Sequence, residues 1–410
     1  MKRLLTSIAL LLFVFCGFAN PINSNYAKKI AKNLFFERAS EFHNIKLKDI
    51  HTELVFTKTQ NNSNLYFVFN IHSSVEGYVI VSADDDVYPI LGYSFQGNYL
   101  VENQPPSFHE MMIIYEKQIL KVISNGLKAD RNIQNEWANL EKQTVYRGNY
   151  RSVSPLVSAH WGQGQYYNRN CPVDASSSYD NRVLVGCVAV AMGQVMHYHK
   201  SPTKGSGSSS YYHSSYGTLA ANYGMTTYNW SGMPNSLSSN NSAVATLLNH
   251  CGVSVEMNYA PTGSGAYTSD AASSLKNYFG YSSTTQYKDK SNYTSSAWES
   301  LLKTEIDNSR PMIYRGHGSS GGHAFVCDGY QGTSNNHFHF NWGWQGSQDG
   351  YFYVSNLNPS TYDFSTSQAA IIGIKPGTTS SIMLTLYDGI TKTPTTLTQY
   401  QSATIWVQLL

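Results

Sequence analysis

The sequence predicts an α+β protein made of two successive blocks, and three observations support this. Of the 28 Lys and Arg residues, 15 lie within residues 1–150, and the chain then becomes rich in Tyr, Ser and Gly. Residues 186–196 are apolar almost all round, which is typical of a helix buried on every side. Residues 323–329 and 336–342 alternate like paired strands. We therefore expect a boundary between the blocks near residues 145–152.

The N-terminus has the pattern of a secretory signal peptide. Lys2 and Arg3 precede an apolar run over residues 4–15, and Gly17-Phe18-Ala19 fits a small-x-small cleavage pattern. We expect residues 1–19 to be removed near Ala19 and the protein to be secreted, with retention at the cell surface left open. No later run approaches 18 apolar residues, so we expect a soluble mature protein without a membrane span. The net charge of +2 gives no indication of nucleic-acid binding.

The first block carries helix and strand patterns but no catalytic constellation. Asn23 or Ser24 can cap a first helix, and Ser107 with Glu110 forms a capping box before a second. Three acidic residues at positions 84–86 are interpreted as a solvated turn and not as a metal site. The expected strands are residues 53–56, 65–69 and 78–81, and a third helix carries Ile133, Trp137 and Leu140.

The second block is expected to contain helices near residues 243–251 and 270–279. Residues 204–217 are interpreted as a surface loop, and residues 316–322 as a flexible Gly-rich loop. The Gly-rich loop lacks the Gly-Lys-Ser/Thr ending of a phosphate-binding loop, which argues against nucleotide binding. Residues 376–410 form a Thr-rich, strand-like extension too short to be a domain by itself.

Cys187 stands at the first turn of the predicted buried helix, directly after Gly186. The positive end of a helix dipole favours thiolate over thiol, so this cysteine is a candidate nucleophile. The alternative is an inert buried cysteine, since free cysteines are among the most buried residues. Four cysteines remain after the signal peptide is removed, too few for a disulfide scaffold if one of them is a free nucleophile.

His323 is the candidate partner of Cys187, 136 residues further along the chain. This separation falls in the window of roughly 130–150 residues between the Cys and the His and Asn of papain-like enzymes. A hairpin closing around Gly332 would place His323 opposite Asn341 and Trp342. An Asn oxygen could then fix the imidazole tautomer, while the indole shields that hydrogen bond from water. The alternative is a structural histidine beside packing aromatics.

Gln163 precedes Cys187 by 24 residues and completes the candidate site. Its amide beside the backbone N–H of Cys187 would form an oxyanion hole, although a glutamine in such a loop is more often solvated.

These motifs resemble the streptopain family of secreted bacterial cysteine peptidases, which belongs to the papain-like clan. The matching stretches are Trp161-Gly162-Gln163 with Tyr167-Asn168, Gly186-Cys187-Val188-Ala189, Gly322-His323-Ala324-Phe325-Val326, Asn341-Trp342-Gly343-Trp344, and, for the family's propeptide, residues 77–84. The resemblance implies an inhibitory propeptide at residues 20–147 and a two-lobed papain-like domain at residues 148–375, with a central buried helix and an antiparallel sheet.

The resemblance also implies the roles of individual residues. Cys187 would be the nucleophile, His323 the base and acid, and Gln163 the oxyanion donor, with Asn341 and Trp342 supporting the imidazole. The residues expected to line the substrate cleft, with an apolar pocket for the side chain one residue upstream of the scissile one, are Met257, Tyr259, Ala260, His317, Ser320 and Gly322.

The expected reaction is peptide hydrolysis through a thioester, without a cofactor or metal. The expected partners are protein or peptide substrates and the chain's own propeptide as intramolecular inhibitor, which self-cleavage between residues 143 and 156 would remove. Two alternatives stay open. The same site could transfer its acyl group to an amine, as in transglutaminase-like enzymes, or the chain could be a non-catalytic exported binding protein.

Overall fold

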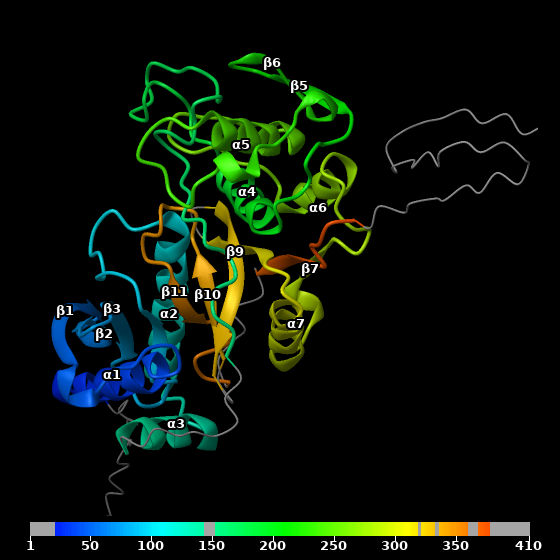
Figure 1. Ribbon diagram of the computed structural model, residues 1–410. Helices are drawn as coiled ribbons and strands as arrows, with labels where there is room; N and C mark the ends of the chain where they lie inside the picture. Colours follow the sequence, from blue (N-terminus) through cyan, green and yellow to red (C-terminus); the bar gives the residue numbers. More distant parts are fainter. Residues whose placement is uncertain (1–20, 143–151, 319–320, 333–335, 360–367, 378–410) are drawn as a thin grey trace, which may run out of the picture.

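The computed structural model describes residues 21–142, 152–318, 321–332, 336–359 and 368–377. We call residues 21–142 the N-terminal block and residues 152–377 the second block. In Figure 1 the helices α4, α5 and α6 form an upper lobe, and a large sheet with α2 and α7 lies below it. The predicted signal peptide and the extension beyond residue 377 lie outside the described residues.

The N-terminal block contains three α-helices and four strands among its described residues. Its elements are α1 (Ser24–Ala39), β1 (His51–Gln60), β2 (Ser63–His72), β3 (Gly77–Ser82), β4 (Ile90–Ser94), α2 (Pro106–Asn125) and α3 (Arg131–Glu141), with one 3-10 turn, η1 (Leu47–Asp49). Asn23 caps α1 by accepting from the backbone N–H of Tyr26 at 2.9 Å, as expected. The expected capping box is wrong, because α2 already begins at Pro106, so Ser107 lies inside the helix.

The second block contributes the remaining elements. They are α4 (Cys187–His199), β5 (Ser208–His213), β6 (Gly217–Asn222), α5 (Ser242–Ser254), α6 (Thr268–Asn277), β7 (Gln286–Asp289), α7 (Ser295–Asp307), β8 (Met312–Gly318), β9 (Gly321–Gln331), β10 (His337–Asn341), β11 (Gly350–Tyr353) and β12 (Ala369–Ile372), with 3-10 turns η2 (Tyr223–Met225), η3 (Trp230–Gly232) and η4 (Lys290–Asn292).

One antiparallel sheet runs through both blocks. Its strand order is β1-β2-β3-β4-β11-β10-β9-β8-β12-β7, and the junction is the pairing of β4 with β11 through Tyr93–Tyr351 and Gly92–Phe352. The α+β fold class is confirmed. The sequence predicted the strands of each block separately, whereas in the structure the strands of both blocks form one sheet.

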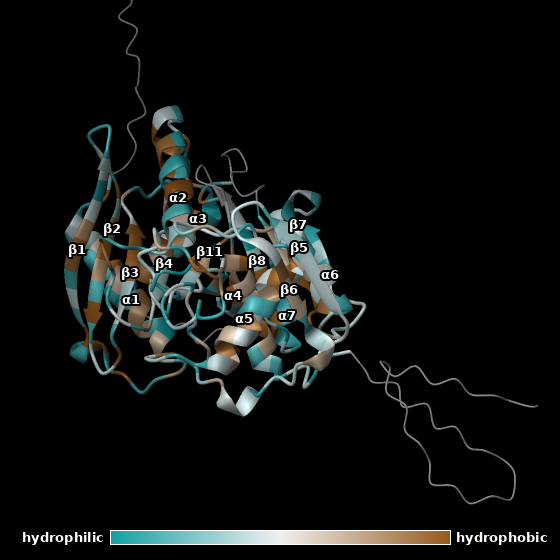
Figure 2. Ribbon diagram, turned by 90° about the horizontal axis from the view of Figure 1, so that it is seen from above, coloured by the Kyte–Doolittle hydropathy of each residue, from teal (hydrophilic) through white to brown (hydrophobic). Residues whose placement is uncertain are grey.

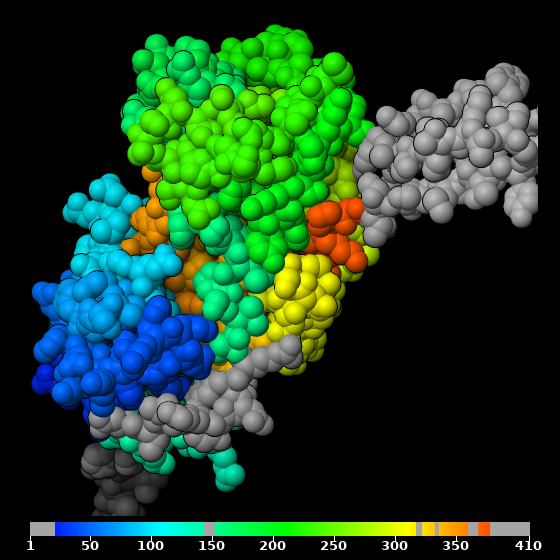
Figure 3. Space-filling model, viewed as in Figure 1, coloured from blue at the N-terminus to red at the C-terminus, as the bar shows by residue number. Residues whose placement is uncertain are grey.

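Helix α2 packs against the part of this sheet that the second block contributes. Its amphipathic pattern is visible in Figure 2, where brown and teal alternate along the helix. The Phe108 ring lies 5.6 Å from Phe352 and 6.0 Å from Trp342, and the Tyr115 hydroxyl donates to the Tyr353 carbonyl at 2.6 Å. The two blocks therefore share one apolar core, and Figure 3 shows their surfaces in direct contact.

The upper lobe is organised around α4, as predicted. Every residue from Val188 to His197 is buried, and the helix packs between α5 and the face of the sheet formed by β8 and β9. Cys187 is the first residue of this helix, and its sulfur accepts from the N–H of Ala324 on β9.

Two segments predicted to be loops contain strands. Residues 204–217 include β5, which pairs with β6 in a two-stranded hairpin. Residues 316–318 and 321–322 belong to β8 and β9, which pair from Met312–Cys327 to Gly318–Gly321. Both segments are rich in Gly and Ser, whose low strand propensity is overridden here by pairing with a neighbouring strand.

Candidate active site

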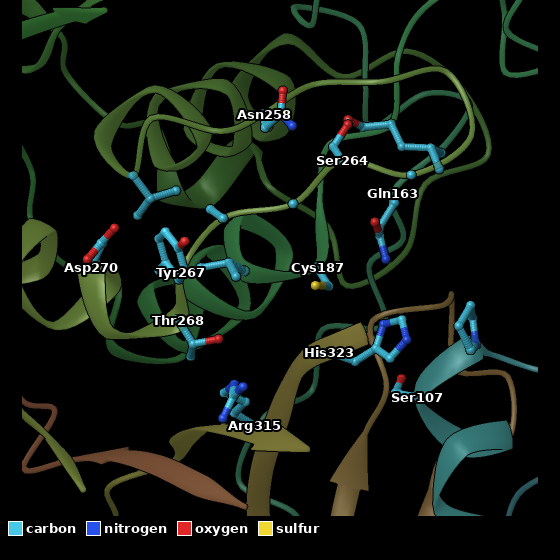
Figure 4. Close-up of a pocket in the computed structure, with 18 of the residues that line it drawn as sticks. Ser107, Gln163, Cys187, Asn258, Ser264, Tyr267, Thr268, Asp270, Arg315 and His323 are labelled. Atoms are coloured by element: carbon cyan, nitrogen blue, oxygen red, sulfur yellow. The ribbon is translucent and has the colours of Figure 1, made fainter. Parts of the chain in front are cut away.

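A cleft of about 890 Å³ lies where the two lobes meet, and its wall includes Cys187, His323 and Gln163. Figure 4 shows these three side chains around one cavity, although they come from α4, β9 and the loop before α4. Residues separated by as many as 160 positions in the sequence are thus brought together.

Cys187 is the first residue of α4 and is partly exposed. The preceding residue, Gly186, has φ +92°, and a Cβ there would approach the Met257 side chain to 2.6 Å. Only glycine takes this conformation without strain, so the backbone that presents the thiol depends on Gly186. The backbone N–H of Ala324 on β9 donates to Cys187 Sγ at 3.4 Å.

Burial raises the pKa of the Cys187 thiol above its ordinary value, although backbone N–H groups of Ala324, Val188 and Cys187 itself act in the opposite direction. Burial in this form of the chain therefore favours the neutral thiol.

His323 pairs with Gly316 on β8, and the predicted register opposite Asn341 is wrong. In the observed β9–β10 pairing Asn341 lies opposite Val326, three residues further along β9. The His323 side chain also borders a small cavity beneath α2, together with Ser107, Glu110 and Met111. The N-terminal block therefore reaches the catalytic histidine candidate directly, as Figure 4 shows for Ser107.

Gln163 is buried and close to Cys187 in the backbone, because its carbonyl accepts from the N–H of Val185 at 2.9 Å. A residue that we did not predict holds the neighbouring segment. The fully buried side chain of Gln194, on α4, accepts from the N–H of Trp161 at 3.0 Å and donates to Asn341 Oδ1 at 3.1 Å. An isolated glutamine in an otherwise apolar helix is the signal that could have identified it.

The Asn341 side-chain amide forms three hydrogen bonds with residues of neighbouring segments. Its oxygen accepts from Gln194 and from the N–H of Gly343, and its NH₂ group donates to the Ala159 carbonyl at 2.7 Å. Asn341 therefore joins β10 to α4 and to the segment before Gln163. Its predicted bond to the imidazole stays a prediction.

Trp342 is fully buried beneath the cleft. Its indole N–H donates to the Gln348 carbonyl at 2.8 Å, and its ring lies 4.6 Å from Phe325, two residues after His323. This packing fixes the end of β10 against β9, and the shielding role predicted for Trp342 stays a prediction.

Only some of the predicted substrate-binding residues line the cleft. Gly322 lines the cleft, whereas Met257 and Tyr259 are buried in the upper-lobe core and Ala260 is only partly buried. The intervening residues Glu256 and Asn258 line the cleft instead. The prediction that Met257 and Tyr259 form an apolar pocket in the cleft is therefore wrong.

Of the remaining predicted cleft residues, His317 is described only in its backbone, which pairs with Gly322, and Ser320 lies outside the described residues.

The acidic cluster at residues 84–86 is not a solvated turn. Asp84 and Asp86 are buried, and Asp86 accepts from Lys128 Nζ at 3.0 Å and from the Ala129 N–H at 2.8 Å. Burial raises the pKa of Asp84 to about 6. The three carboxylates are close together, but their bonds to Lys128 and to backbone N–H groups give them a structural role in the N-terminal block.

The other three cysteines in the described part of the chain are free and buried. Cys171 is 2% exposed, and Cys327 is fully buried in the core of the sheet. Burial raises the pKa of all three thiols, so Cys187 alone combines exposure with a helix N-terminus among the described cysteines. None of the described helices is both long and apolar enough to cross a membrane.

Comparison with known proteins assigns a family to each block. Residues 161–352 match the model of the peptidase C10 family, and residues 19–119 match that of the Spi protease inhibitor. The first match contains Gln163, Cys187, His323, Asn341 and Trp342, and the second contains α1, the four strands β1–β4 and most of α2.

Individual relatives cover most of the chain. Streptopain from Streptococcus pyogenes is 32% identical over an alignment of 416 positions, which covers 91% of this chain and 98% of the relative. The thiol protease/hemagglutinin PrtT from Porphyromonas gingivalis is 31% identical over 92% of this chain, which spans only 44% of the relative's length. Among solved structures, a prointerpain A fragment from Prevotella intermedia matches with a TM-score of 0.64 and 32% identity, over 80% of this chain and all of that fragment.

The expected streptopain-type family is thereby confirmed, in both its catalytic part and its inhibitory part. The chain belongs to the peptidase C10 family of cysteine peptidases and carries a Spi-type inhibitor region ahead of its peptidase region.

Proposed function

We propose that this chain is the precursor of a secreted cysteine endopeptidase, with Cys187 as nucleophile. One observation carries the proposal: a partly exposed cysteine at a helix N-terminus shares a cleft with a histidine and a buried glutamine. These are the groups that acyl transfer to and from a thiol requires.

The proposed reaction proceeds in two halves. His323 takes the thiol proton, and Cys187 Sγ attacks the carbonyl carbon of the scissile peptide bond. Gln163 and the N–H of Cys187 donate to the oxyanion that forms, and His323 then protonates the leaving amine. Water, deprotonated by His323, attacks the thioester, releases the acid product and restores the thiol. Asn341 and Trp342 hold the end of β10 beside the strand that carries His323.

The N-terminal block acts as an inhibitor within the same chain. Two contacts support this role: Pro106 and Ser107 of α2 line the cleft that contains Cys187, and α2 also borders His323 from the side away from the thiol. Substrate entry and the approach of His323 to Cys187 both require this helix to leave. We place the inhibitory propeptide at residues 20–147 and the peptidase domain at residues 148–375, after a signal peptide of residues 1–19.

Active-site labelling combined with hydrolysis tests this function. The mature protein should be labelled at Cys187 by a peptide epoxide and should hydrolyse denatured casein without an added amine. Cys187→Ala should abolish both and His323→Ala should nearly abolish hydrolysis, whereas Cys251→Ala, which removes a buried thiol of the same block, should keep both. Labelling without hydrolysis until an amine is added would identify an acyltransferase. If the wild-type protein showed no labelling and no hydrolysis, this result would contradict a catalytic function.

A further inference from the structure

Arg315 lies one strand away from the residue whose N–H contacts the nucleophile, although nothing in its local sequence indicated this position. It is on β8 directly opposite Ala324, the residue whose N–H donates to Cys187 Sγ at 3.4 Å. Neighbouring strands are about 4.8 Å apart, so the Arg315 backbone is one strand away from the residue that contacts the thiol.

The Arg315 side chain lies on the face of the sheet that forms the floor of the cleft. Side chains directly opposite one another in an antiparallel pair share a face, and Arg315 pairs with Ala324 on one side and Ala369 on the other. Because both neighbours are alanines, the sheet has no large side chain beside the guanidinium. The cleft lining includes Arg315, and Figure 4 shows its side chain directed toward the cavity.

The Arg315 guanidinium lacks a paired carboxylate among the residues that the structure describes. In the part of the chain that the structure describes, no ion pair or hydrogen bond involves the Arg315 side chain. Two acidic residues also line the cleft, Glu256 and Asp270, but both are exposed, whereas Arg315 is half-buried. A charge held on a partly buried floor is screened less by water and salt than charges at an exposed edge. The floor of this part of the cleft is therefore positive.

The position of Arg315 relative to His323 indicates which part of a substrate it meets. In Figure 4, Arg315, Thr268 and Tyr267 lie on one side of Cys187, and Gln163 and His323 lie on the other. The leaving amine must face His323 to receive its proton, so the residues before the scissile bond extend toward Arg315. This step rests on the proposed function.

We propose that Arg315 is a specificity-determining residue that binds an Asp or Glu side chain on the acyl side of the scissile bond. A planar guanidinium with two free edges can pair with a carboxylate through two parallel hydrogen bonds, which a lysine could not do. The acidic preference takes the place of the apolar preference expected from Met257 and Tyr259, both of which are buried away from the cleft.

Matched pairs of fluorogenic peptides test the proposal. The peptides differ only by Glu or Gln at one position before the scissile bond, and each acyl-side position is varied in turn. At one position kcat/KM should favour Glu by about tenfold to a hundredfold, the size expected for one partly desolvated charge pair. Arg315→Gln should bring this ratio close to one, and Arg315→Glu should make the enzyme favour Lys over Gln there. Lys288→Gln is the matched control, because Lys288 is on β7 of the same sheet but on its other face, and it should keep the ratio.

Two results would overturn the assignment while leaving the proposed function intact. One is equal cleavage of the Glu and Gln peptides at every acyl-side position by an enzyme that is labelled at Cys187. The other is a Glu preference that Arg315→Gln leaves in place. Absence of both labelling and cleavage would instead contradict the proposed function, and the role of Arg315 with it.

Discussion

The thiol of Cys187 is subject to two opposing influences. Its place at the start of α4 and three nearby backbone N–H groups favour the thiolate, while burial favours the neutral thiol and raises its pKa. Pro106 and Ser107 of the N-terminal block line the same cleft as Cys187. We expect departure of α2 to open this cleft further to water.

We therefore expect the pKa of Cys187 to fall when the N-terminal block is removed. A lowered thiol pKa makes the thiolate the main form from slightly acid pH upward, so mature protein should react with iodoacetamide across that range. The precursor should react only as pH rises past the ordinary thiol pKa. The rate of alkylation against pH, followed by mass spectrometry for both forms, measures this directly. Superimposable profiles would show that the N-terminal block does not control the thiol.

Gln163 is expected to act only in the transition state. Gln163→Ala should lower kcat by roughly 10²–10³, the usual effect of losing one oxyanion donor, while labelling by a peptide epoxide persists. The exposed neighbour Gln165 provides a matched control, and Gln165→Ala should leave kcat within about twofold, since surface changes away from a site have small effects. Equal losses in the two variants would remove Gln163 from the mechanism.

The site residues differ in how far the sequence could identify them. Cys187, Gly186 and Gln163 were recognisable because each carries a chemical or conformational signal in its own local pattern. Arg315 gave none, and Gln194 gave only its isolation in an apolar helix, because the role of each depends on what faces it: the N–H of Trp161 for Gln194 and the cleft floor for Arg315. Met257 and Tyr259 were misplaced because the chain turns through Glu256, at φ +49°, just before them.

Among the elements, long periodic segments were predictable and strand pairing was not. Helix α4 follows from its unbroken apolar sequence, and α1 from its cap and spacing. The β9–β10 register failed at the turn, because His337 lies opposite Gln331 and the pairing is therefore not centred on Gly332. The register shift between His339 and Phe340 changes the pairing by only one residue. Strand β4 has only five residues and owes its formation to β3 and β11 on either side.

A buried hydrogen bond between an aspartate and a histidine anchors the first described segment of the second block. Asp328 on β9 accepts from the His339 imidazole at 2.7 Å and from the N–H of Val157 at 2.8 Å, and its side chain is fully buried. Val153 pairs with Tyr330 through two backbone bonds of 2.9 and 3.0 Å. Cleavage after Val153 would remove these bonds, so the mature chain is expected to begin before it.

Removing the charge of Asp328 should therefore destabilise the peptidase part. Asp328→Asn is expected to lower the free energy of unfolding by about 3 kcal/mol, because it leaves a buried histidine without its carboxylate partner. Urea denaturation of the Cys187→Ala protein with and without this change gives the difference. Asp180→Asn, at an exposed position whose left-handed backbone suits Asn, is the control and should change it by less than about 0.5 kcal/mol. A change of that small size in Asp328→Asn would show that the pair does not anchor the segment.

At the scale of the whole molecule, the ten-stranded sheet links inhibition to folding. The edge of β11 is paired with β4 in the precursor and becomes open when the N-terminal block leaves. An open strand edge can accept another strand, and the apolar residues beneath α2 become accessible at the same time. The separated block should therefore bind back to the mature enzyme in the same way.

Added in trans, residues 20–142 should inhibit the mature enzyme. The comparison variant is Phe108→Ala, which removes the ring that packs against Phe352 and Trp342 and should weaken inhibition by roughly tenfold to a hundredfold or more, as expected for a buried aromatic contact. Inhibition is measured as the residual rate of casein hydrolysis against the concentration of the added block. If the folded wild-type block leaves the rate unchanged, its function is to assist folding and not to inhibit.

The conversion of the purified precursor tests the central claim, that Cys187 is the nucleophile of a peptidase that the N-terminal block holds inactive. Precursor beginning at residue 20 is incubated without any other protease, and the products are followed by intact-mass spectrometry. Wild-type protein should shorten to a form that begins between residues 143 and 152 and gain hydrolytic activity at the same rate, while Cys187→Ala should keep its full mass. Conversion of the Cys187→Ala protein at the wild-type rate would contradict the account.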